Sequence, residues 1–76
     1  MYKVTFYDFS KRFADELNID VVVGKELSEI PEYDSMGKIN ISLLIEELFN
    51  FQIEYEDLNT SGNLEELYNM CERNKN

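Results

Sequence analysis

The sequence predicts one all-α domain over residues 1–76, and three observations support this. Apolar residues recur at the three- and four-residue spacing of helices in residues 3–17, 36–50 and 61–72. The 43% hydrophobic and 13% aromatic content is that of a folded domain, and 76 residues suffice for one. The valine run at residues 21–23 has no obvious partner strand. We therefore expect four helices, with a short third helix and a long loop between the first two.

The first helix is expected from about Lys3 to Leu17. Thr5 and Asp8 have the spacing of a capping box, and Asn18 is a suitable left-handed stop. One face of this helix carries Tyr2, Phe6, Phe9, Phe13 and Leu17. Such a face predicts packing against the rest of the domain.

A long loop is expected from Asn18 to Asp34. Its valines at 21–23 have low helix propensity and indicate extended chain or a turn, or else a lone strand. Leu27 and Ile30 are expected to hold the loop against the helices, and Pro31 favours an extended Ile30. Ordered loops of this length are uncommon unless they have a function, so attention falls on the residues that this loop delivers.

Ser35 is the candidate functional residue. Asp34-Ser35 can be read simply as a helix start, because either side chain can accept a hydrogen bond from the first turn. The preceding loop favours a second interpretation, in which the serine is exposed and rigidly aimed. A phosphate ester on its hydroxyl would lie at the positive end of the helix dipole, where backbone N–H groups favour an anion.

The helix from Met36 to about Asn50 has two apolar stripes. The broad stripe, expected in the core, contains Ile41, Leu44, Ile45, Leu48 and Phe49. The narrow stripe contains Met36, Ile39 and Leu43, and Glu46 and Glu47 lie beside it. In one interpretation both stripes are buried in a small bundle. In the other, the narrow stripe is an exposed docking strip, since an apolar line rimmed by carboxylates suits a basic protein surface.

The C-terminal third is expected to complete the bundle. Residues 55–58 can form one short helical turn, and Thr60 is a suitable N-cap for a last helix from about Ser61 to Glu72. Cys71 is expected to be a small buried hydrophobe, and residues 73–76 a frayed tail. The expected core contains Phe6, Phe9, Phe13, Leu27, Leu44, Leu48, Phe49, Leu64, Leu67 and Tyr68.

The residues around Ser35 resemble the acyl carrier proteins. In both, Asp-Ser and a bulky apolar residue open a helix, which here ends in Ile-Glu-Glu-Leu-Phe. The matching residues are Asp34, Ser35, Met36, Ile39, Leu43, Ile45, Glu46, Glu47, Phe49 and Ile53. The resemblance implies a four-helix bundle of the acyl-carrier type. It also implies a 4′-phosphopantetheine arm, covalently attached to Ser35 from coenzyme A, whose thiol holds an acyl group as a thioester.

The same resemblance implies the partners. A phosphopantetheinyl transferase would load Ser35, and acyl-loading, elongating or acyl-transferring enzymes would follow, each with a basic docking surface. In the family, the helix that begins at the serine is the main recognition surface. The corresponding residues here are Met36, Ile39, Leu43, Glu46 and Glu47.

Two departures from the family pattern leave the pathway open. Tyr33 precedes Asp34 where carriers of primary fatty-acid synthesis usually have a small residue, and Gly37-Lys38 replaces an acidic or polar pair. This looks more like carriers of polyketide, aminoacyl or surface-polymer pathways. The alternatives are an aminoacyl or peptidyl carrier, or an acidic helical interaction module with no arm, in which Ser35 only caps a helix.

Composition argues against several other classes. A net charge of −9 disfavours nucleic acid and anionic membrane surfaces, which recruit basic proteins. With no histidine and one cysteine, neither a Ser-His-Asp nor a Cys-His site nor a zinc site can form, and no calcium or phosphate loop occurs. We expect no enzymatic activity and no metal site. The single cysteine and the lack of a leader or membrane-spanning run favour a cytoplasmic protein, and a monomer is expected.

Overall fold

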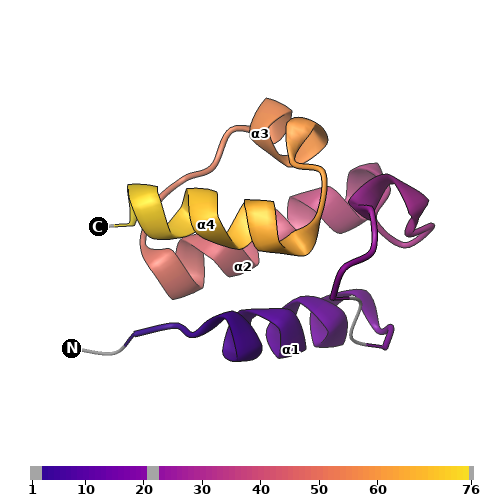
Figure 1. The fold of residues 1–76 in the computed structure, drawn as a ribbon. Coiled ribbons are helices and arrows are strands. Elements are labelled where there is room, and N and C mark those ends of the chain that lie inside the picture. The colour runs from indigo at the N-terminus through magenta and orange to yellow at the C-terminus, as the bar shows by residue number, and fades with distance from the viewer. Residues whose placement is uncertain (1–2, 21–22, 76) are drawn as a thin grey trace.

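The computed structural model describes residues 3–20 and 23–75. Within these ranges the chain forms α1 (Phe6–Leu17), the 3₁₀ turn η1 (Leu27–Glu29), α2 (Ser35–Phe49), α3 (Tyr55–Thr60) and α4 (Leu64–Asn74), and it contains no strand (Figure 1). The expected all-α fold is therefore confirmed for the described residues. Expectations for Tyr2 and for most of the valine run concern residues outside these ranges.

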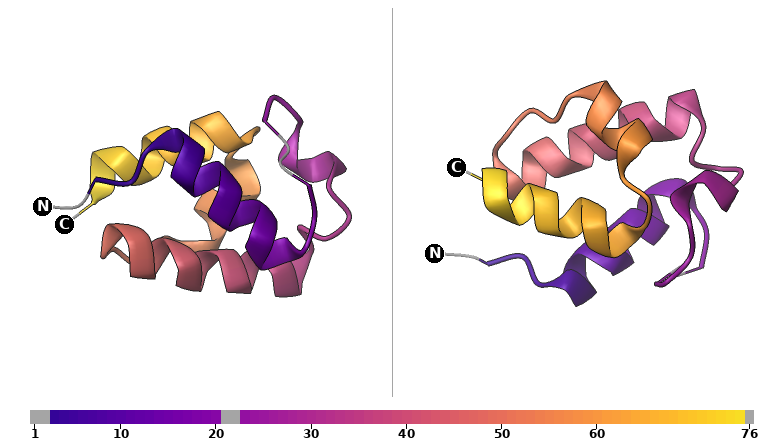
Figure 2. Two further views of the ribbon diagram at one scale, coloured as in Figure 1. Left: turned by 90° about the horizontal axis from the view of Figure 1, so that it is seen from below. Right: turned by 45° about the horizontal axis from the view of Figure 1, so that its top comes forward.

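Three helices surround the core and the short one lies at its edge. α1 and α4 both contact α2 and each other, while α3 contacts α2 and connects it to α4 (Figures 1 and 2). α4 ends on the same side of the molecule on which α1 begins (Figure 1). The start of α2 lies at the opposite end of the bundle, beside the loop that follows α1 (Figure 2).

The first helix begins three residues later than expected, at Phe6. Thr5 is its N-cap, with an extended backbone, and the Thr5 hydroxyl accepts a hydrogen bond from the Asp8 N–H at 3.0 Å. A residue in this role cannot lie inside the helix, so the start at Lys3 was wrong. The stop at Asn18 is confirmed, because this residue is left-handed with φ 58°.

The last helix also begins later than expected. Thr60 is the last residue of α3 and does not cap α4, because its hydroxyl donates back to the Asp57 carbonyl. The N-cap of α4 is Asn63, whose side chain accepts from the Glu66 N–H at 2.9 Å. At the other end, Arg73 and Asn74 belong to the helix, so the expected frayed tail was too long.

The core contains most of the residues expected there. Seven of the ten are buried, and Phe6, Leu48 and Tyr68 are partly buried around them. The expected burial of Cys71 is confirmed at 0% exposed. Two buried side chains outside the expected core explain how the loop is held: Tyr33 is 5% exposed and Leu58 is 0% exposed.

The loop before α2 is tied to the bundle at several points. The Leu27 N–H donates to the Gly62 carbonyl at 2.9 Å, within a single β-bridge between Glu26 and Asn63. Leu27 and Ile30 are buried, as expected, and Ile30 is extended before Pro31. The described part of the loop therefore approaches α2 along a defined path.

Candidate functional site

Ser35 is the first residue of α2, and the capping role belongs to its neighbour. The Asp34 carboxylate accepts a hydrogen bond from the Gly37 N–H at 2.9 Å, and the Asp34 carbonyl accepts from the Lys38 N–H at 2.8 Å. Ser35 is exposed, and within the described residues its hydroxyl makes no hydrogen bond. Because Asp34 already caps the helix, the Ser35 hydroxyl has no structural task in this arrangement.

Gly37 fixes the position of the loop against α2. A Cβ atom at this position would collide with the Glu32 carbonyl oxygen and would lie 3.1 Å from the Leu17 side chain. Only glycine permits this approach of the loop and the end of α1 to the first turn of α2. The sequence carried a signal, since glycine within a helix disfavours the helix unless packing requires it.

Tyr33 holds the residue pair Asp34-Ser35 from the other side. Its hydroxyl donates to the Leu58 carbonyl in α3 at 3.1 Å, and its ring lies 5.6 Å from the ring of Phe13. Burial raises the pKa of the Tyr33 phenol well above its usual value, so the neutral donor persists at physiological pH. The unusual aromatic residue of the motif is thus a core residue that connects the loop to α3.

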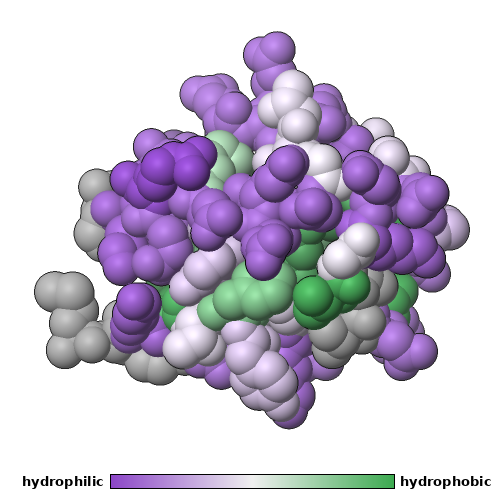
Figure 3. All heavy atoms as spheres, in the orientation of Figure 1, coloured by the Kyte–Doolittle hydropathy of each residue, from purple (hydrophilic) through white to green (hydrophobic). Residues whose placement is uncertain are grey.

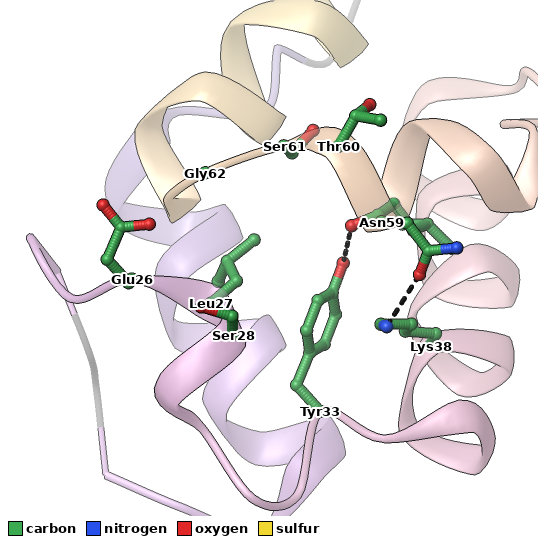
Figure 4. Close-up of a pocket in the computed structure, with 10 residues that line it drawn as sticks. Glu26, Leu27, Ser28, Tyr33, Lys38, Asn59, Thr60, Ser61 and Gly62 are labelled. Atoms are coloured by element: carbon green, nitrogen blue, oxygen red, sulfur yellow. Dashed lines mark hydrogen bonds between the residues drawn. The ribbon is translucent and has the colours of Figure 1, made fainter.

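Lys38 lies between Tyr33 and α3 (Figure 4). Its ammonium donates to the Asn59 side-chain oxygen at 2.7 Å and lies 5.4 Å from the centre of the Tyr33 ring. The centre of the Tyr55 ring lies 5.9 Å from the same ammonium. Cation–π contacts of this kind hold the ammonium near the start of α2. Neither Lys38 nor Asn59 was identified as a site residue from the sequence.

The narrow stripe of α2 is exposed. Met36 is 70%, Ile39 48% and Leu43 60% exposed, so the interpretation that both stripes are buried is wrong for this helix. Beside Leu43 and the exposed Glu46, a shallow hollow of about 320 Å³ extends to Ile53 and Glu54. The two stripes therefore face different surroundings.

The two glutamates beside the stripe differ in their contacts. Glu47 forms an exposed ion pair with Arg12 of α1 at 3.0 Å. Any other cation that bound this carboxylate would compete with Arg12. Such pairs contribute only about 0.2–1 kcal/mol to stability. No described cation pairs with Glu46, which makes it the more direct probe of docking.

The start of α2 leaves backbone N–H donors beside Ser35. The Ser35 and Met36 N–H groups make no hydrogen bond within the described chain, as is usual in a first helical turn. Lys38 is three residues further along the helix, on a neighbouring position of the surface. The positive end of the helix dipole favours an anion here, whereas the neighbouring Asp34 carboxylate disfavours one, and the Lys38 ammonium is directed to Asn59 and Tyr33.

The described residues contain no group of three or more side chains able to hold a metal ion. Within residues 3–20 and 23–75, no helix has the length and apolar character required to cross a bilayer. Comparisons of the chain with protein families, with curated proteins and with solved structures find no match.

Proposed function

We propose that this chain is a carrier protein with a bundle of the acyl-carrier type, whose Ser35 holds a 4′-phosphopantetheine arm transferred from coenzyme A. The observation that carries the proposal is the first turn of α2. There an exposed serine with a free hydroxyl follows a residue that already caps the helix. The thiol of the arm would hold an acyl group as a thioester for other enzymes, and the chain itself would catalyse nothing.

The rigid approach to Ser35 supports this proposal. Gly37 and Tyr33 lie on either side of the Asp34-Ser35 pair, and both are tied to parts of the chain distant in sequence. A transferase must place one hydroxyl against one phosphorus atom, and a fixed acceptor favours that geometry. A surface serine without a function would not need a fixed position.

The docking strip of Met36, Ile39 and Leu43, with Glu46 and Glu47 beside it, supports the proposed partners. Its apolar side chains are exposed, and they lie on the helix that begins at Ser35. The partners would be a phosphopantetheinyl transferase and acyl-handling enzymes with basic surfaces, which the carboxylates attract. The proposal includes a monomer in the cytoplasm.

Intact mass spectrometry tests the proposal. The chain is incubated with a broad-specificity phosphopantetheinyl transferase and coenzyme A, and the mass of one phosphopantetheinyl group should be added. Ser35→Ala should abolish the addition and keep the helical circular dichroism. Ser42→Ala, on the same helix, is the matched control and should be modified like the natural chain. A labelled Ser35→Ala variant would refute the proposed site.

The alternatives give different outcomes. An aminoacyl or peptidyl carrier would also be modified at Ser35, and the chemistry of its loading enzyme would distinguish it. An acidic interaction module would remain unmodified and would bind a basic protein through the exposed docking strip. The free hydroxyl of Ser35 favours the carriers over this module, because a serine that acts as a helix cap would accept a hydrogen bond.

A further inference from the structure

A polar pocket of about 190 Å³ lies beside the start of α2 (Figure 4). It is bounded by η1 and its preceding residue, by Lys38 of α2, and by the connection from α3 to α4. Seven of its ten lining residues have hydroxyl, amide or charged side chains: Glu26, Ser28, Tyr33, Lys38, Asn59, Thr60 and Ser61.

The walls of the pocket are tied together. The Tyr33 hydroxyl and the Leu58 carbonyl close one side at 3.1 Å, and the Leu27 N–H and the Gly62 carbonyl close another at 2.9 Å. The Ser61 hydroxyl donates to the Asp57 carbonyl at 2.9 Å and so fixes the connection after α3. These hydrogen bonds hold the walls of the pocket in place between the loop and α3.

The pocket is within reach of a group attached to Ser35. Lys38, which lines the pocket, is three residues after Ser35 on α2. Side chains at this spacing are neighbours on a helix, with about 5–6 Å between their Cβ atoms. A phosphopantetheine arm is longer than this, so it would fold back on itself to place its acyl end against the lining groups.

The interior behind the pocket is closed to an alkyl chain. Leu58 and Ile45 are 0% exposed, and the Tyr33 ring fills the space between the loop and Phe13. An alkyl chain could enter only by displacing such side chains. An alkyl chain in the polar pocket would instead take water from hydroxyl and amide groups without replacing their hydrogen bonds, which is unfavourable.

Lys38 supplies the donor that a polar acyl group would need. An ammonium has three donors, and one of them is used by the Asn59 side-chain oxygen. The remaining donors are available to a carbonyl, hydroxyl or carboxylate oxygen in the pocket. Asn59 holds Lys38 in place and so acts through it.

We propose that this pocket receives the acyl end of the arm and that it favours a short acyl group bearing a hydrogen-bonding substituent over an unsubstituted alkyl chain. The proposal rests on the proposed carrier function and names its class of cargo. Lys38 is the specificity-determining residue. The polar lining disfavours long alkyl groups in this pocket, and the closed core disfavours them in the interior.

The test compares two cargoes on the same protein. Ser35 is loaded from 3-hydroxybutyryl-coenzyme A or from octanoyl-coenzyme A, and intact mass confirms each product. Amide spectra by ¹⁵N nuclear magnetic resonance are then compared with those of the arm alone. The hydroxybutyryl group should shift the amide signals of Ser28, Asn59 and Ser61, and the octanoyl group should leave these signals and that of Ile45 unchanged.

Two results would overturn the inference. One is an octanoyl group that shifts the signals of Ile45 and Leu58, because the chain would then have entered the core. The other is a hydroxybutyryl group that leaves the pocket signals unchanged. If mass spectrometry shows no arm on Ser35, the proposed function itself fails and this inference fails with it.

A variant pair separates a role in binding from a role in folding. Lys38→Gln should lower the population with an occupied pocket about fivefold, as expected for the loss of one hydrogen bond. Its melting temperature should change little, because the Lys38–Asn59 contact is exposed. Lys25→Gln, an exposed loop lysine outside the pocket lining, is the control and should behave like the natural chain. Equal pocket shifts in Lys38→Gln and the natural chain would contradict the role of Lys38.

Discussion

Two faces of α2 carry apolar residues, but one of these faces is buried in the bundle and the other is exposed to solvent. Ile41 and Ile45 are 0% exposed against the other helices, while Met36 and Leu43 are 70% and 60% exposed on the other side. Burying one such side chain fully would stabilise the fold by about 1.5–3 kcal/mol. The bundle leaves this stabilisation unused on the face that carries Met36 and Leu43.

Contacts, and not the hydrophobicity of individual residues, separate the two faces. α1, α3 and α4 all contact α2, and together they cover the face that carries Ile41 and Ile45. Hydrophilic side chains cover much of the face that carries α4, and apolar side chains show there in several patches, the clearest near the boundary with α1 (Figure 3). The exposed stripe of Met36, Ile39 and Leu43 is confined to one face of α2.

The largest expected difference between the faces is in stability. Ile45→Ala should lower the free energy of unfolding by about 2–5 kcal/mol, because it leaves a cavity in a closed core. Leu43→Ala should change it by less than about 0.5 kcal/mol, because Leu43 is exposed. Urea denaturation followed by circular dichroism measures both. Similar losses in the two variants would mean that Leu43 is buried in solution.

A second comparison concerns the first turn of α2. Gly37→Ala should destabilise the protein by about 1–3 kcal/mol, because the new methyl group meets the Glu32 carbonyl oxygen and forces the loop to move. Ser35→Ala, two residues earlier and exposed, should cost less than about 0.5 kcal/mol. Thermal denaturation checks this pair. A tolerated alanine at Gly37 would show that the loop does not depend on this contact.

Sequence patterns predicted the local features of this site better than its distant contacts. The caps at Thr5 and Asn18 and the two stripes of α2 follow from spacing and residue type. The N-cap of α4 was misassigned because Thr60 and Asn63 are both suitable caps within four residues, and only the hydrogen bonds distinguish them.

The support of Ser35 could not be read from the sequence. Tyr33 is buried, and its hydroxyl donates to the carbonyl of Leu58, 25 residues further along the chain. Local periodicity carries no information on such a contact. The same holds for Lys38 and Asn59, which meet only when α3 packs beside α2. A pattern of residues predicts elements, whereas the polar pocket arises from how the elements pack.

Alkaline pH should lower the free energy of unfolding, because the buried Cys71 thiol resists ionisation in the folded state. Burial, with a smaller effect from the charge of Glu72, raises the pKa of Cys71 from an ordinary 9.0 to about 12 in the folded state. The resulting stability is fully present below pH 9 and is lost as the pH rises through the folded pKa, because the unfolded thiol ionises first. Between pH 8 and pH 10.5 the loss from this thiol should reach about 2 kcal/mol.

Cys71→Ala provides the comparison for this effect. The variant is less stable at pH 8 because of its cavity, but its stability should fall less steeply with pH. Tyr33, whose pKa is also raised by burial, contributes to the alkaline loss in both proteins. Urea denaturation at the two pH values measures the difference in slope. Parallel slopes would show that the thiol is not buried.

Charge reversal beside the exposed stripe of α2 should change the rate at which the transferase modifies Ser35. Glu46→Lys should slow phosphopantetheine transfer by weakening the encounter with a basic transferase, and the effect should be larger at low salt. Glu65→Lys, a charge reversal at another exposed glutamate, on α4, is the matched control and should have a smaller effect. Glu47 is the weaker choice because reversing its charge also breaks the ion pair with Arg12. Equal slowing in the two variants would show that overall charge matters and the docking strip does not.

The most direct measurement for the whole account is the position of the arm in the natural chain. After coexpression with a broad-specificity phosphopantetheinyl transferase, the protein is digested and the modified peptide is sequenced by tandem mass spectrometry. We predict one phosphopantetheinyl group, on Ser35. A chain that stays unmodified, or one modified at another serine, would contradict the assignment of the start of α2 as the functional site.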